Sequence, residues 1–174
     1  VFSSPFDSTS VDFLETLNVP CYKIASFEIT DLSLIEYVAS KKKPMIMSTG
    51  MATNNEIRDA VNAATSNGCS ELILLKCTSA YPATAEDANL NTIVDIKKNF
   101  NCNVGLSDHT KGIGVAVASI VLGASVIEKH FTLDRNDGGV DSEFSLEPDE
   151  MKQLFDETQK AWSWLGDVSN GPTK

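Results

Sequence analysis

Two segments that each end in a histidine decide how this chain folds: Asn103-Val-Gly-Leu-Ser-Asp-His109 and Ala124-Ser-Val-Ile-Glu-Lys-His130. Each apolar run is short enough for a β-strand, and the histidines lie 21 residues apart, which leaves room for one helix and two turns. This spacing is typical of a β-α-β unit, in which two neighbouring parallel strands end at the same edge of a sheet. The two histidines, the only ones in the sequence, are therefore predicted to lie side by side.

The same alternation of short apolar runs and longer amphipathic runs continues on both sides of this unit. Thr53 and Glu56 predict a capping box at the start of one helix, and Gly68 and Gly123 are typical of helix ends. Repeated strand–helix units predict an α/β fold with a parallel sheet, either an open doubly wound sheet or part of a (β/α)₈ barrel. The predicted strands are 1–4, 21–25, 45–48, 72–77, 104–107 and 125–130, and the predicted helices are 10–17, 32–40, 54–66, 92–99, 113–122 and 148–165.

Composition narrows the classes of partner. The chain has 174 residues, about one domain, with 42% hydrophobic residues and a net charge of −10. An acidic protein repels nucleic-acid phosphates and anionic membranes, so we expect neither as a partner. No run of 18 apolar residues occurs, so no membrane-spanning segment is predicted.

The cysteines and the chain ends point to a cytoplasmic protein that continues beyond this sequence. Four cysteines occur without a CxxC pair, which favours free thiols in a reducing cytoplasm. Cys77 ends the apolar run that starts at Leu72, which favours a reduced, packed thiol. The first residue is Val1 and no signal peptide is visible, which suggests a fragment or a processed chain. Residues 166–174 are predicted to begin a linker.

The predicted strand ends are unusually polar, and side chains at this edge of a parallel α/β sheet commonly form the active site. Hydroxyls and a lysine suit a phosphate or a carboxylate, and two imidazoles suit a divalent transition metal. The candidates are Ser3, Ser4, Asp7, Lys23, Ser26, Ser48, Thr49, Thr78, Ser79, Tyr81, Ser107, Asp108, His109, Glu128, Lys129 and His130.

Structural explanations stand beside these functional ones. Ser48 and Thr49 could cap the turn before the helix at 54–66, and Asp108 could form a turn or orient a histidine. A single histidine is more often structural than metal-binding, although two at successive strand ends favour a metal. An inward-facing Lys23 is costly unless it is paired, which favours a functional role.

Five ordered motifs carry a resemblance to a known family. The chain resembles the sialic acid synthases, and most closely their pseudaminic acid synthase branch, over nearly its whole length. The motifs are Ser-Thr-Gly-Met-Ala-Thr (48–53), Lys-Cys-Thr-Ser-Ala-Tyr-Pro (76–82), Gly-Leu-Ser-Asp-His-Thr (105–110), Ile-Glu-Lys-His-Phe-Thr-Leu-Asp (127–134) and Asp-Ser-Glu-Phe-Ser-Leu-Glu-Pro (141–148).

The resemblance implies a metal-dependent condensation of phosphoenolpyruvate with an N-acetylated amino sugar, giving a nonulosonic acid and phosphate. It implies that His109 and His130 bind the metal, commonly Mn²⁺, with Mg²⁺, Co²⁺ or Fe²⁺ as alternatives. Lys23, Glu128 and Asp141 would be the catalytic residues, with Glu128 beside the metal and Asp141 facing the sugar. The substrate-binding residues would be Ser4, Lys23, Ser26, Ser48, Ser79, Tyr81 and Ser107.

The resemblance also implies a TIM (β/α)₈ barrel, of which residues 1–165 would form six of the eight β/α units. Residues 166–174 would lead to a C-terminal antifreeze-like domain, through which the full-length relatives form homodimers. Because the first two strands of the family would be missing, the chain alone is expected to be inactive or impaired. Two alternatives remain: a metal-dependent pyruvate aldolase on the same barrel, and an inactive truncated paralogue that only binds a ligand or a partner subunit.

Overall fold

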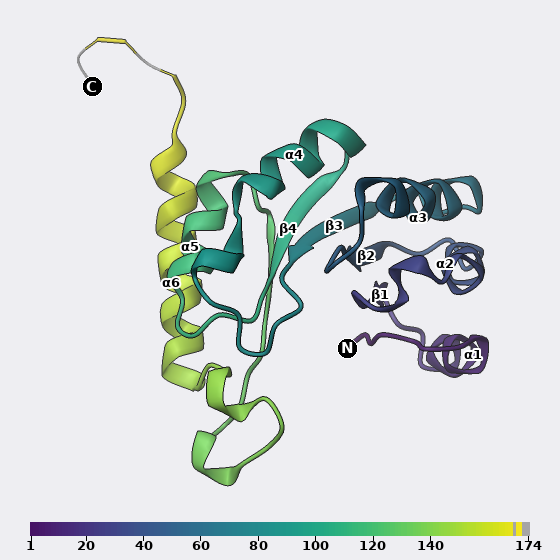
Figure 1. Ribbon diagram of the computed structural model, residues 1–174, viewed down its shortest axis with the longest axis horizontal. Coiled ribbons are helices and arrows are strands. Elements are labelled where there is room, and N and C mark those ends of the chain that lie inside the picture. The colour runs from purple at the N-terminus through teal and green to yellow at the C-terminus, as the bar shows by residue number, and fades with distance from the viewer. Residues whose placement is uncertain (169, 172–174) are drawn as a thin grey trace.

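The computed structural model describes residues 1–168 and 170–171, and within them each of five parallel strands is followed by a helix (Figure 1). The sheet has the strand order β1-β2-β3-β4-β5, so every strand pairs with its neighbour in the sequence. The strands are β1 (Tyr22–Ile24), β2 (Met45–Ser48), β3 (Leu72–Cys77), β4 (Asn103–Asp108) and β5 (Val126–Lys129). This sequential parallel order, with helices on one side, is that of a partial (β/α)₈ barrel, as predicted.

The helices follow an arc outside the strands, from α1 at one end to α6 at the other (Figure 1). The helices are α1 (Ser8–Thr16), α2 (Leu32–Ala39), α3 (Asn54–Ser66), α4 (Asn91–Phe100), α5 (Gly114–Val121) and α6 (Pro148–Leu165). The predicted capping box is present, because the Thr53 side chain accepts from the N–H of Glu56 while the Glu56 carboxylate accepts from the N–H of Thr53. The sequence therefore fixes the start of α3 locally.

The predicted first strand, Val1–Ser4, is wrong, so the described residues contain five strands of the barrel rather than six. Its one backbone contact with β1 is the hydrogen bond from the N–H of Lys23 to the carbonyl of Ser3, at 3.3 Å. Val1 and Phe2 are exposed, and Pro5 lacks the N–H that could extend a ladder. The apolar residues at this position therefore bury too little surface to hold a strand.

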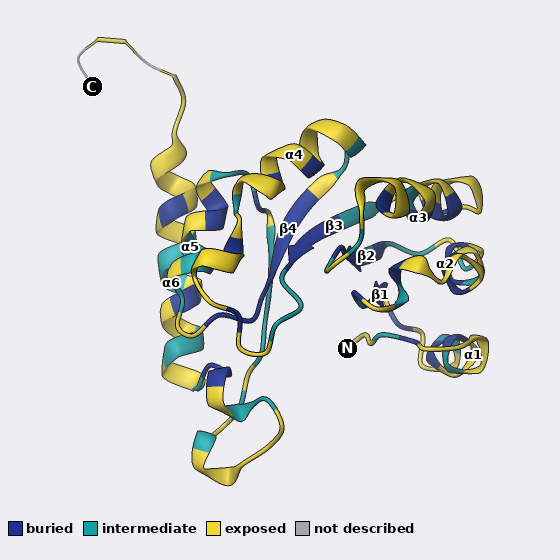
Figure 2. Ribbon diagram, in the orientation of Figure 1, coloured by how far each residue is buried: buried dark blue, intermediate teal, exposed yellow. Residues whose placement is uncertain are grey.

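The hydrophobic core lies between the strands and the arc of helices, where buried residues line the facing surfaces (Figure 2). Met47 and Leu74 point to this outer face of the sheet and are fully buried, as is Ile35 of α2. Since successive residues of a strand alternate between faces, the residues between them turn to the inner, concave face. The core on one face thus determines which side chains reach the other.

Residues beyond α6 add no test of the predicted linker at 166–174. Positions 169 and 172–174 of that linker lie outside the described residues, and the assignment stays a prediction. None of the helices in the described part of the chain combines the length and the apolar character that a membrane crossing requires.

Gly105 of β4 provides a test of the sheet packing. A Cβ at this position would lie 2.3 Å from the carbonyl oxygen of Val126 and 2.6 Å from Cδ2 of Leu75. We expect Gly105→Ala to lower the free energy of unfolding by about 1–3 kcal/mol, the usual cost of overpacking, in a urea titration. Gly114→Ala is the control, because a Cβ there meets nothing within 4 Å. Equal stabilities of the two variants would contradict the close approach of β4 and β5.

Candidate active site

The carboxyl ends of the five strands surround a cavity of about 270 Å³ on the concave face of the sheet. Ladder register explains the convergence, because Cys77 pairs with Ser107, and Ser107 pairs with Glu128 on the next strand. These three side chains therefore point to the same face. The cavity is lined by Ser4, Lys23, Ala25, Ser26, Ser48, Cys77, Tyr81, Ser107, His109, Glu128 and His130, nine of which the sequence singled out.

Lys23 is the buried cation of this cavity, with 7% of its surface exposed. Its Nζ lies 2.8 Å from Oγ of Ser48 and 3.4 Å from Oε2 of Glu128. The other carboxylate oxygen of Glu128 accepts a hydrogen bond of 2.7 Å from Ser107. Lys23 is thus paired, as an inward lysine must be, and its partners come from the adjacent strand β2 and from β5 at the opposite edge of the sheet. The ammonium and the hydroxyls together form a cradle that an anion could enter.

The two histidines lie side by side, as the spacing predicts, with ring centroids 5.2 Å apart. His109 is buried, and its Nδ1 lies 2.9 Å from the carbonyl oxygen of Thr78, so Nδ1 carries the proton that it donates there. Burial lowers the pKa of His109, but its hydrogen bonds with Cys77 and with the carbonyl of Thr78 outweigh this effect and raise the pKa above its usual value. In the neutral ring, this tautomer leaves Nε2 of His109 with a free lone pair. His109 therefore meets the first requirement of a metal ligand, an unprotonated nitrogen held in a fixed orientation.

His130 is less buried, and Nδ1 of its ring lies 3.6 Å from Oδ2 of Asp141. Burial lowers the pKa of His130, as does the neighbouring His109 when that ring is protonated, and both effects favour the neutral form of His130. The ring of Tyr81 lies 4.2 Å from that of His109 and 6.2 Å from that of His130, measured between centroids. One wall of the cavity is therefore aromatic, and its two imidazoles are available as ligands.

The candidates named from the strand ends alone do not line the cavity: Ser3, Asp7, Thr49, Thr78, Asp108 and Lys129. Of the residues to which the resemblance gives a role, two lie at its margin. Asp141 comes from the segment before the short helix Ser142–Phe144 and reaches the cavity through its contact with His130. Ser79 belongs to an adjacent groove, and its Oγ is buried without a hydrogen-bond partner. A Cβ on Gly50 would lie 2.9 Å from Oγ of Ser79 and 2.7 Å from Oγ of Ser26, so these two hydroxyls flank Gly50.

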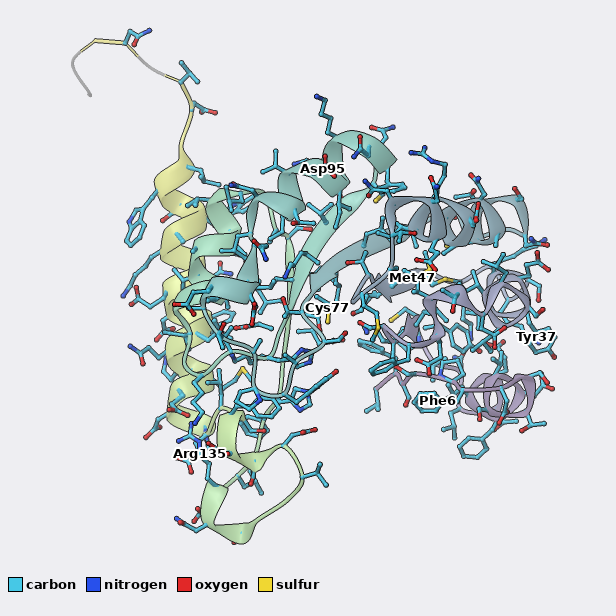
Figure 3. All side chains as sticks on the ribbon, in the orientation of Figure 1. Phe6, Tyr37, Met47, Cys77, Asp95 and Arg135 are labelled. Atoms are coloured by element: carbon cyan, nitrogen blue, oxygen red, sulfur yellow. The ribbon has the colours of Figure 1, made fainter. Side chains whose placement is uncertain are left out.

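Cys77 is the lining residue with a reactive group that sequence reasoning missed. Its apolar neighbours favoured a packed thiol, whereas the side chain extends from the end of β3 among those at the centre of the molecule (Figure 3). Burial alone would raise the pKa of this thiol, but hydrogen bonds with His109, Ser26 and Ser107 lower it. The register of Cys77 with Ser107 was the signal that could have identified it.

Comparisons with known proteins decide the family, because residues 1–170 match the family model described as NeuB. The chain belongs to the NeuB family. It is 47% identical over 166 residues to a pseudaminic acid synthase of Campylobacter jejuni, and 44% identical over 167 residues to an N,N'-diacetyllegionaminic acid synthase of the same species. Each alignment covers 95% of the chain, and 48% and 50% of these relatives, respectively. The sequence resemblance is thereby confirmed.

A solved NeuB relative matches the structure closely. The N-acetylneuraminic acid synthetase of Leptospira borgpetersenii, solved in complex with citrate, superposes with a TM-score of 0.93 at 37% sequence identity. The match covers 98% of this chain and 59% of that one. The chain spans about half the length of the curated relatives it matches.

Proposed function

We propose that the protein condenses phosphoenolpyruvate with an N-acetylated amino sugar in its aldehyde form, giving a nonulosonic acid and inorganic phosphate. The observation that carries this proposal is that Lys23, several hydroxyls and two adjacent imidazoles line the same cavity. A cation with hydroxyl donors suits a phosphorylated carboxylic acid, and neutral imidazoles suit a divalent metal. Membership of the NeuB family, whose matched relatives are named as synthases of such acids, supports the same reaction.

The donor set fits a divalent cation only if the substrate or water supplies further ligands. Among the described residues, no group of three or more His, Cys, Asp and Glu side chains is arranged to hold a metal ion. His109 and His130 would hold the ion, which we propose to be Mn²⁺, with Mg²⁺, Co²⁺ and Fe²⁺ as alternatives. When bound, such an ion would polarise the sugar aldehyde as a Lewis acid.

The side chains of the cavity would hold the phosphoenolpyruvate and stabilise the charges that change. Lys23, Ser26, Ser48 and Ser107 would bind its phosphate and carboxylate, with Ser4 and Ser79 nearby, while Tyr81 and Asp141 would face the sugar. C3 of phosphoenolpyruvate forms a bond with the aldehyde carbon, and water then adds at C2. The resulting tetrahedral intermediate expels phosphate by breaking the C2–O bond, and Lys23 offsets the negative charge on the departing group. Glu128, beside Lys23 and Ser107, is placed to accept a proton from the water.

Location and assembly belong to the same proposal. We place the reaction in the cytoplasm, where the four free cysteines would stay reduced. We expect a homodimer for the full-length enzyme.

The experiment uses protein expressed from the complete open reading frame, supplied with Mn²⁺, phosphoenolpyruvate and an N-acetylated amino sugar. We expect one inorganic phosphate for each nonulosonic acid, measured by a phosphate assay and mass spectrometry. Phosphoenolpyruvate labelled with ¹⁸O in its bridging position should pass the label to phosphate, because the C2–O bond breaks.

Two other outcomes would reject the proposal in different ways. Formation of the nine-carbon product from pyruvate without phosphate release would identify the alternative metal-dependent aldolase. Binding of phosphoenolpyruvate without any condensation, across a panel of N-acetylated hexosamines and their dideoxy relatives, would identify a paralogue that only binds ligand.

A further inference from the structure

A buried ion pair lies directly behind the two histidines, on the outer face of the sheet. Oδ2 of Asp108 is 2.7 Å from Nζ of Lys129, and these side chains are only 1% and 2% exposed. The two residues are register partners at the ends of β4 and β5. Because side chains alternate along a strand, the next residues, His109 and His130, turn to the inner face.

The backbone ladder between β4 and β5 ends at this pair, so the histidines lie one residue beyond it. Past that point their backbones are held by different neighbours. The carbonyl of His109 accepts from the N–H of Ala83 at 3.0 Å, and the carbonyl of His130 accepts from the N–H of Leu146 at 2.8 Å. One histidine is thus tied to the connection after β3 and the other to the segment before α6, on opposite sides.

Lys129, the residue before His130, contacts the segment that carries His109. Besides Asp108, its ammonium donates to the backbone carbonyl of Thr110, so it contacts the chain on both sides of His109. Asp108 also stabilises the turn formed by residues 108–110. Its Oδ1 accepts from the N–H of Thr110 at 2.9 Å and from the Thr110 hydroxyl at 2.7 Å. The segment that carries His109 is therefore clasped by the residue that precedes His130.

Stability alone does not explain an ion pair at this place. Apart from Lys76, the neighbouring strand residues on the outer face of the sheet are apolar, such as Met47, Leu74 and Leu106. Replacing a buried ion pair by well-packed apolar residues is often neutral or stabilising, because desolvation of the two charges offsets their attraction. A directional contact between two strand ends fixes their separation, which an apolar contact does less well.

We propose that Asp108 and Lys129 are positioning residues that set the separation of His109 and His130, and through it the affinity for the divalent cation. This inference rests on the metal-binding role given to the two histidines under the proposed function.

The test is a titration of metal-free protein, expressed from the complete open reading frame, with Co²⁺ alone. The d–d absorption of Co²⁺ reports both binding and the geometry of imidazole ligation. The variant is the double substitution Asp108→Asn and Lys129→Met, in which Asn keeps the oxygen that accepts from Thr110. We expect the dissociation constant for Co²⁺ to rise about 10- to 100-fold, the usual effect of losing residues that orient metal ligands, with an altered absorption band.

Lys76→Met is the matched control. Lys76 lies on the same outer face, is 6% exposed, and donates to the hydroxyl of Thr78 and the carbonyl of Asp87 rather than to a carboxylate. It should bind Co²⁺ as tightly as the wild type. Lys129→Arg keeps the ion pair and should retain most of the affinity that the double variant loses.

The outcomes separate the two proposals. If the wild type binds no Co²⁺, the metal-binding role of the histidines fails and the positioning role fails with it. If the wild type binds and the folded double variant binds equally well with an unchanged spectrum, the positioning role alone is overturned. Should the double variant not fold, Asp108→Asn alone decides, because it removes one charge and keeps the turn; unchanged Co²⁺ affinity in that variant overturns the proposal.

Discussion

Protein in which both His109 and His130 are replaced by alanine is expected to lose metal binding and synthase activity together. The two rings are the nitrogen donors whose centroids lie 5.2 Å apart, and Nδ1 of His109 is already committed to the carbonyl of Thr78. Without them we expect kcat/KM to fall by at least about 10³-fold, since a metal that polarises a carbonyl contributes several kcal/mol. Metal content after dialysis and steady-state phosphate release measure the two effects.

The single variants make this prediction sharper. Each is expected to weaken Mn²⁺ binding, and His109→Ala the more strongly, because a backbone carbonyl 2.9 Å away orients this ring, whereas the polar side-chain partner of His130, Asp141, lies at 3.6 Å. Cys102→Ala, which removes a thiol outside the cavity, is the control and should keep its metal. Retention of stoichiometric Mn²⁺ by the folded double variant would remove the metal assignment, whatever its activity.

Strand alternation made much of this site predictable from sequence. Once 103–109 and 124–130 are neighbouring parallel strands, the period of two fixes which side chains share a face, so Ser107 and Glu128 must lie beside the histidines. Local signals were equally reliable, as for α3, which begins and ends at the predicted residues. The predicted strand that is absent, at 1–4, depended on pairing with a neighbouring strand, which is a tertiary property.

The failures have specific physical causes. Val1–Ser4 has strand-like composition, but β propensity expresses packing on a sheet, and here the segment lies exposed at the edge. Cys77 is a buried free thiol, as its apolar neighbours favour, but its place in the lining of the cavity was missed, because that depends on its register with Ser107. The ion pair of Asp108 with Lys129 was not predicted, because the two residues are 21 apart in the sequence and only the register of β4 against β5 brings them together.

The second large effect is expected at Lys23. Its ammonium is the buried positive charge of the cavity and lies 3.4 Å from the carboxylate of Glu128. Lys23→Met removes that charge and leaves Glu128 uncompensated, so the cavity changes from one that attracts an anion to one that repels it. We expect kcat/KM for phosphoenolpyruvate to fall about 10²- to 10³-fold, similar to the loss of one charge-stabilising donor.

Steady-state kinetics with saturating sugar separate the two contributions of Lys23. Lost attraction for the bound substrate raises KM, whereas lost stabilisation of the departing phosphate lowers kcat, and we expect both. Adding Glu128→Gln to Lys23→Met should restore part of KM by removing the repulsion, without restoring kcat. Lys43→Met is the matched control. Nζ of Lys43 lies 2.7 Å from Oε1 of Glu15, and this ion pair is not part of the cavity lining. If Lys23→Met and Lys43→Met left both constants equally unchanged, the phosphate would have to bind elsewhere, and the cradle formed by Lys23 and Ser48 would be structural.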